Sequence, residues 1–198
     1  MMKHAMYISL FLLLCLAESC TNDRMISISF DTAERLMHTQ PDSTLHILQT
    51  LDEQHILHGA QKARFALLYY EALEKNDLAF PNDTLIENAI DYYNSQRDYQ
   101  RLGLALFYQG KRYLQRDSIT KAMFAFLQSE KMLQRYRDEE LLGTVNFEMA
   151  LLYQEQHNYK EALTHFQQSL ALFQKTDNKK EEGHLLLKNS RPVIYFRS

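Results

Sequence analysis

The chain has 198 residues, of which 45% are hydrophobic and 24% are charged, with 22 lysines and arginines against 25 aspartates and glutamates. The resulting net charge of −3 argues against nucleic acid as a partner, because binding nucleic acid needs a basic surface. There are only five glycines and three prolines, and no strand-like alternation of useful length. The sequence therefore predicts a single elongated domain of the all-α class.

Residues 1–19 predict a secretory signal peptide. Lys3 gives the segment a positive start, and an apolar run over residues 5–16 follows. Such a run suits a signal peptide and is too short for a membrane-spanning helix, which needs about 20 residues. Small residues, Ala17 and Ser19, then stand three and one positions before Cys20.

The position of Cys20 resembles a bacterial lipobox, in which the cysteine after the cleavage point receives a lipid. Cys15 would be removed with the signal, so Cys20 would be the only cysteine of the mature chain. We therefore predict lipid attachment at Cys20, with residues 20–28 as the lipidated N-terminus and tether, in a membrane-anchored protein that faces the periplasm. Ordinary cleavage to a soluble periplasmic protein is the alternative.

Two less regular helical hairpins are predicted next. Residues 29–57 form the first, which is interrupted at Pro41, a residue that suits the first turn of a helix. Residues 59–96 form the second, a degenerate hairpin in which Thr84 and Glu87 have the spacing of a capping box.

A pattern then recurs at an offset of forty residues, over residues 98–136 and 138–176. The first copy has Gly110, Tyr113, Ala122, Phe126 and Ser129, and the second has Ala150, Tyr153, Ala162, Phe166 and Ser169. Small residues let two helices cross closely, and aromatic residues three or four positions away fill the space beside them. These residues are therefore predicted to pack the two helices of each hairpin together. The second copy also predicts Asn158 as a helix cap, with Glu161 three residues on.

This order of small and aromatic residues resembles the tetratricopeptide repeat (TPR), a helix–turn–helix unit of about 34 residues. The resemblance implies a right-handed superhelical solenoid of antiparallel, TPR-like hairpins, with about four hairpins and an incomplete one. The run 36–48 further resembles the opening of bacterial TPR lipoproteins and of the N-terminal TPR part of membrane-bound regulators. Glycines also recur forty residues apart at Gly103, Gly143 and Gly183, so Gly183 restarts the pattern, but Pro192 interrupts it. Residues 179–198 are therefore expected to be an incomplete terminal repeat and tail, truncated or frameshifted near Asn189.

In a TPR solenoid the concave groove is lined by the first helix of each hairpin. The groove residues expected from this are Leu104, Phe107, Lys111 and Leu114 in one copy, and Thr144, Phe147, Leu151 and Gln154 in the next. Lys111 is expected to be exposed. A partly apolar groove of this kind suits an amphipathic helix or an extended segment of an unknown partner protein or peptide.

No catalytic, cofactor or metal site is predicted. Motifs for binding phosphates or dinucleotides and for nucleophilic catalysis are missing from the sequence. His55 and His58 are expected at an exposed helix end, and His157 and His165 at the surface. The leading hypothesis is thus a membrane-anchored periplasmic scaffold for protein–protein interaction. The alternative is the N-terminal sensory fragment of a TPR-containing signalling or transcription regulator.

Overall fold

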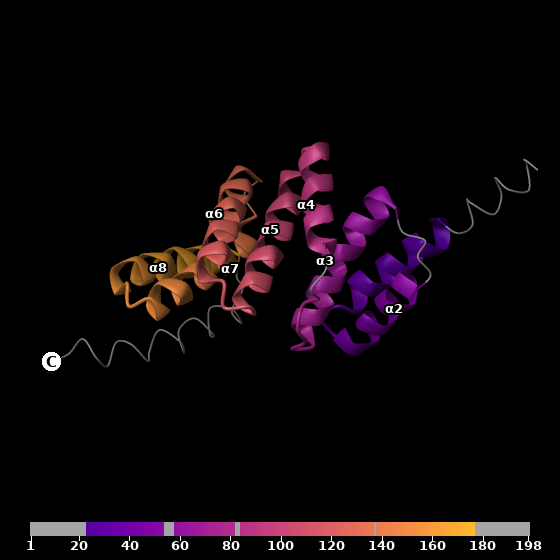
Figure 1. The fold of residues 1–198 in the computed structure, drawn as a ribbon, viewed down its shortest axis with the longest axis horizontal. Helices are drawn as coiled ribbons and strands as arrows, with labels where there is room; N and C mark the ends of the chain where they lie inside the picture. Colours follow the sequence, from indigo (N-terminus) through magenta and orange to yellow (C-terminus); the bar gives the residue numbers. More distant parts are fainter. Residues whose placement is uncertain (1–22, 54–57, 82–83, 137, 177–198) are drawn as a thin grey trace, which may run out of the picture. The chain divides into compact units, whose positions relative to one another are not determined.

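The computed structural model describes residues 23–53, 58–81, 84–136 and 138–176, and all regular secondary structure within these ranges is α-helical (Figure 1). The helices are residues 23–36, α2 (Pro41–Glu53), α3 (Gly59–Lys75), α4 (Leu85–Gln96), α5 (Tyr99–Leu114), α6 (Ile119–Tyr136), α7 (Glu139–Glu155) and α8 (Tyr159–Lys175). The predicted all-α class is confirmed. The expected signal peptide, Cys20, His55 and the terminal segment 179–198 lie outside the described residues.

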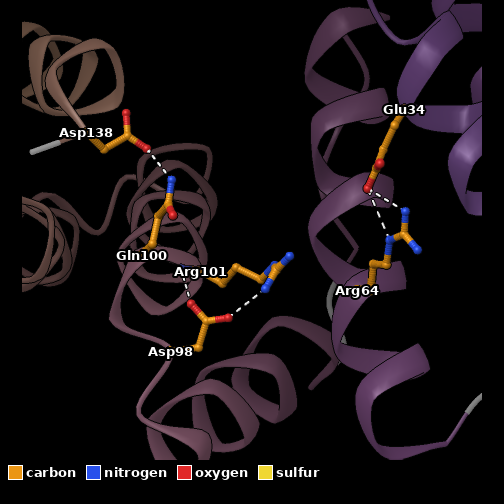
Figure 2. Close-up of polar contacts among 6 residues, drawn as sticks. All are labelled: Glu34, Arg64, Asp98, Gln100, Arg101 and Asp138. Atoms are coloured by element: carbon orange, nitrogen blue, oxygen red, sulfur yellow. Dashed lines mark hydrogen bonds and ion pairs between the residues drawn. The ribbon is translucent and has the colours of Figure 1, made fainter. Parts of the chain in front are cut away.

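The chain divides into two compact units after Ala79, and the first contains the helix over residues 23–36, α2 and α3. Arg64 on α3 forms ion pairs with Asp31 (2.9 Å) and Glu34 (2.8 Å) of the first helix; Figure 2 shows the contact with Glu34. Buried side chains of the first helix include Ile26 and Phe30. The described part of this helix starts at residue 23, so residues 23–28, which were expected to belong to a tether, are helical, and Ile26 among them is buried in the core.

The second unit contains two hairpins, α5 with α6 and α7 with α8, and α4 packs on α5 while α6 packs on α7. Asp98 and Asp138 cap α5 and α7, since each carboxylate accepts a hydrogen bond of 3.1 Å from a backbone N–H of the first turn. Gln100 Nε2 also donates to Asp138 Oδ2 at 3.2 Å, which links the starts of the two helices (Figure 2). The predicted caps Thr84 and Asn158 make no side-chain capping bond.

The forty-residue register runs through three pairs of helices. Asp77, Asp117 and His157 follow α3, α5 and α7, and each has a left-handed backbone, with φ of 53°, 54° and 59°. The buried positions of the following helices also correspond: Ile86, Ala89 and Tyr93 in α4, Phe126, Ser129 and Leu133 in α6, and Phe166, Ser169 and Phe173 in α8. Residues 59–96 therefore share the register of the two regular repeats.

The predicted hairpin over residues 59–96 nevertheless has its two helices in different compact units, because α3 closes the first unit and α4 opens the second. Phe80, the first residue after Ala79, contacts α5 and the turn that follows α5. The backbone N–H of Phe80 donates to Gln115 Oε1 at 2.8 Å, and the Phe80 ring meets Tyr108 edge-on with centroids 6.3 Å apart.

Each regular hairpin contains the same buried hydrogen bond between its two helices. The hydroxyl of Ser129 donates to the carbonyl oxygen of Gly103, and that of Ser169 donates to Gly143, both at 2.7 Å. The glycines allow this approach: a Cβ added at Gly143 would lie 2.7 Å from Cε1 of Phe173. The glycine and the serine of the repeated pattern are therefore two sides of one helix contact.

We predict that Gly143→Ala lowers the free energy of unfolding by up to about 2 kcal/mol. Alanine gains about 1 kcal/mol of helix propensity, but overpacking a tight core costs about 1–3 kcal/mol, and the Phe173 ring is 2% exposed and has little room to move. Denaturant unfolding measures the change.

Gly110→Ala is the matched control. A Cβ at Gly110 would lie closer still to an aromatic ring, at Cε1 of Phe126, so this ring must shift. The second hairpin shows an arrangement with room for the methyl group, because it carries Ala150 at the equivalent position, packed with Phe166. The repeat therefore accommodates a methyl group there, and the change in stability should stay within about 1 kcal/mol. Greater stability for both variants would show that the glycine contacts do not limit packing.

Candidate protein-binding surface

The predicted groove residues lie on α5 and α7, the first helices of the two regular hairpins. Seven of them are half-buried: Leu104, Lys111, Leu114, Thr144, Phe147, Leu151 and Gln154. The eighth, Phe107, is only 3% exposed, and its ring centroid lies 5.9 Å from that of Phe126 on α6. Phe126 sits over the bare backbone of Gly110 and so reaches Phe107. Phe107 is therefore a packing residue and not part of an open surface, which corrects the sequence-based expectation.

Lys111 is not the open, exposed lysine that the sequence predicted. Its Nζ lies 2.7 Å from Oε1 of Glu148 on α7, and the two side chains are 23% and 13% exposed. This ion pair joins the first helices of neighbouring hairpins. The sequence pattern missed it because Glu148 has no acidic counterpart forty residues earlier, where Tyr108 stands.

The repeated packing positions lie at the helix contacts. Gly110, Ala122, Phe126, Ala150, Ala162 and Phe166 are buried, and Tyr113 and Tyr153 are half-buried. In the second hairpin, Phe147, Leu151 and Tyr153 pack against the cluster of Ala150, Ala162, Phe166 and Phe173. Two of the candidate groove residues, Phe147 and Leu151, therefore contact this core cluster.

A polar cluster connects α7 and α8 where the preceding hairpin is apolar. Asn146, 2% exposed, and His165 occupy the places of Leu106 and Ala125. The amide nitrogen of Asn146 donates to the carbonyl of Leu142 at 2.9 Å, so its Oδ1 faces Nδ1 of His165, also at 2.9 Å. Because Oδ1 can only accept, Nδ1 carries the proton.

His165 was expected at the surface, and the structure places it half-buried. Its ring stacks on Tyr153 with centroids 5.3 Å apart and an interplanar angle of 15°. Burial lowers the pKa of His165 below its usual 6.5, while Glu130 on α6 and Glu161 on α8 act in the opposite direction. The sequence could have indicated this contact, because Asn146 and His165 replace the apolar Leu106 and Ala125 at the same repeat positions.

The remaining candidate residues give no sign of metal chemistry. His58 is exposed and precedes α3. Within the described ranges, no group of three or more histidine, cysteine, aspartate or glutamate side chains could hold a metal ion. None of the described helices combines the length and the apolar character needed to cross a bilayer.

No protein-family model matches the sequence, and no curated protein matches it either. Among solved structures, the chain is similar to a protein from Podosopora anserina that is described as a kinesin light chain with nearly identical TPR-like repeats. The TM-score is 0.56 at 13% identity, and the match covers 88% of this chain and 98% of the other. At this identity the likeness concerns the fold, and by fold the chain is a TPR-like repeat protein.

We predict that Lys111→Met lowers the free energy of unfolding by about 1–3 kcal/mol, because it leaves the mostly buried carboxylate of Glu148 without its cation. Lys175→Met is the control: Lys175 is 60% exposed and lies 3.4 Å from Glu139, so its loss should cost less than about 1 kcal/mol. A double-mutant cycle of Lys111→Met with Glu148→Gln should give a coupling energy well above the error of the unfolding measurement. A coupling energy near zero would show that the pair does not hold the helices together.

We also predict a component of stability that is lost as the pH falls below about 6.5. The folded pKa of His165 is lowered, so the unfolded chain takes up the proton more readily than the folded one. The stabilisation from neutral His165 is complete above the unfolded pKa and disappears as the pH drops through the folded pKa. The double variant Asn146→Leu/His165→Ala copies Leu106 and Ala125 of the preceding hairpin. It should lose this component in unfolding curves from about pH 8 to about pH 5. An unchanged pH profile would contradict the assignment to His165.

Proposed function

We propose that this chain is a membrane-anchored periplasmic scaffold that holds a segment of a partner protein against α5 and α7. The observation that carries the proposal is the paired surface of these helices. Both helices present half-buried apolar side chains, and the ion pair between Lys111 and Glu148 links one helix to the other. Rows of apolar side chains on neighbouring helices are a common docking site for peptide segments.

The chemistry of this surface favours a partner that offers apolar side chains. Leu104, Leu114, Phe147 and Leu151 are the apolar groups. Two of the polar groups among them already have hydrogen-bond partners within the protein: Lys111 pairs with Glu148, and the Thr144 hydroxyl donates to the carbonyl of Glu140 at 3.1 Å. A lysine that is neutralised in this way is poorly suited to gripping a free carboxylate. An amphipathic helix or an extended segment fits better, bound by its apolar side chains.

The sequence around Cys20 supports the membrane anchor. A positive start, a short apolar run and small residues before the cysteine together suit export and lipid attachment. The described helical structure starts at residue 23, so only two residues separate Cys20 from the first folded unit. An anchor at this position would keep that unit close to the membrane.

Site-specific photo-crosslinking in cells of the source organism tests the binding surface. A photoreactive phenylalanine derivative at Leu104 or Leu151 should form adducts with the same partner protein. Gln128 and Gln168, which are exposed at equivalent positions of α6 and α8, are the matched controls and should form no such adduct. Adducts that form equally well at the control positions, or none at Leu104 and Leu151, would contradict binding along α5 and α7.

A further inference from the structure

The helix over residues 23–36 has two faces of different character. Ile26 and Phe30 are each 2% exposed, and Ala33 is fully buried. Met25 and Ile28 lie outside this buried row and are 62% and 49% exposed. They are three residues apart, so they are neighbours on one side of the helix.

The acidic and basic residues of this helix differ in their contacts. The acidic ones are engaged with α3: Asp23 accepts a hydrogen bond of 2.9 Å from Gln61, and Asp31 and Glu34 pair with Arg64. The two arginines, Arg24 and Arg35, are exposed. They stand four residues before and seven residues after Ile28, and therefore on the same side of the helix as Ile28.

Arg24, Met25, Ile28 and Arg35 thus form an outward face that combines apolar and basic side chains. Asp31, whose side chain is 65% exposed, lies at the edge of this face and is paired with Arg64 of α3. Scattered exposed apolar residues are ordinary on a protein surface. Flanked by arginines on a helix whose opposite face is buried, they have the composition of a helix that lies in a membrane interface. Arginines at such a position are attracted to anionic headgroups.

The position of Cys20 selects a membrane over a protein partner for this face. Three residue steps separate Cys20 from residue 23, and an extended chain of that length spans at most about 10 Å. A lipid on Cys20 would therefore keep the start of the helix within about that distance of the headgroups.

We propose that the outward face lies on an anionic phospholipid surface, with Met25 and Ile28 at the boundary of headgroups and acyl chains and with Arg24 and Arg35 on lipid phosphates. This inference rests on the proposed anchor at Cys20. It adds that the first unit is oriented on the membrane by this helix and does not swing freely from its lipid.

The test uses the full chain produced in a bacterial host, with the mature protein placed in vesicles of phosphatidylcholine with or without phosphatidylglycerol. A fluorophore on Ile28→Cys should be strongly quenched by spin-labelled lipids in the vesicles that contain phosphatidylglycerol, and less in the others. Ser27→Cys is the matched control, because Ser27 is exposed and equally close to the anchor but lies outside the outward face. It should be quenched much less. Arg24→Gln with Arg35→Gln should abolish the difference between the two labelled positions while the protein stays in the membrane.

Equal quenching at positions 27 and 28 would overturn the proposal. Shielding of position 28 from aqueous iodide without quenching by lipid would also overturn it, because a second copy of the chain would then cover the face. The anchor is tested separately. Mass spectrometry reports the lipid on Cys20, and Cys20→Ser should release the protein from the membrane. If the protein carries no lipid, the anchor fails, and the label is then placed on Ile28→Cys in a Cys20→Ser chain; its quenching on added phosphatidylglycerol vesicles still decides whether the face binds lipid.

Discussion

The close approach of two helices at a bare glycine backbone is the constraint on which the second unit depends. Gly103 and Gly143 let the following helix come near enough for Ser129 and Ser169 to bond their carbonyl oxygens at 2.7 Å. A serine hydroxyl that bonds a helical carbonyl leaves no buried polar group unsatisfied. The aromatic residues then fill the space around this contact, and Phe147 and Leu151 of the half-buried row on α7 pack against the same cluster. The helix packing and the candidate binding surface are therefore adjacent.

The sequence could predict the parts of this arrangement that repeat. Alanine and phenylalanine at the same offset in two copies, as at Ala122 and Ala162 or Phe126 and Phe166, have an explanation only in helix packing, and the structure buries all four. Helix periodicity also placed Leu104 and Leu151 on a partly open side. Both inferences follow from the spacing of residues along one helix, and neither depends on which residues the neighbouring helices bring into contact.

The parts that could not be predicted depend on partners from other helices. Phe107 has the helical position of a groove residue, but Phe126 covers it. Glu148 and His165 differ from their counterparts forty residues earlier, and only the neighbouring helix reveals that they meet Lys111 and Asn146. The division after Ala79 likewise depends on contacts that Phe80 makes with α5 and the turn after it.

The shared left-handed turns at Asp77, Asp117 and His157 have a consequence for how such a chain can change in length. Duplicating or deleting a forty-residue window that starts between Leu104 and Tyr136 would keep the turns and the glycine–serine pairs at their spacing. Adding a single residue within α5 or α7 would instead rotate the following side chains by about 100° and separate glycine from serine. Whole-module recombination is therefore the tolerated route for lengthening the surface on α5 and α7, and small insertions are confined to the links between hairpins.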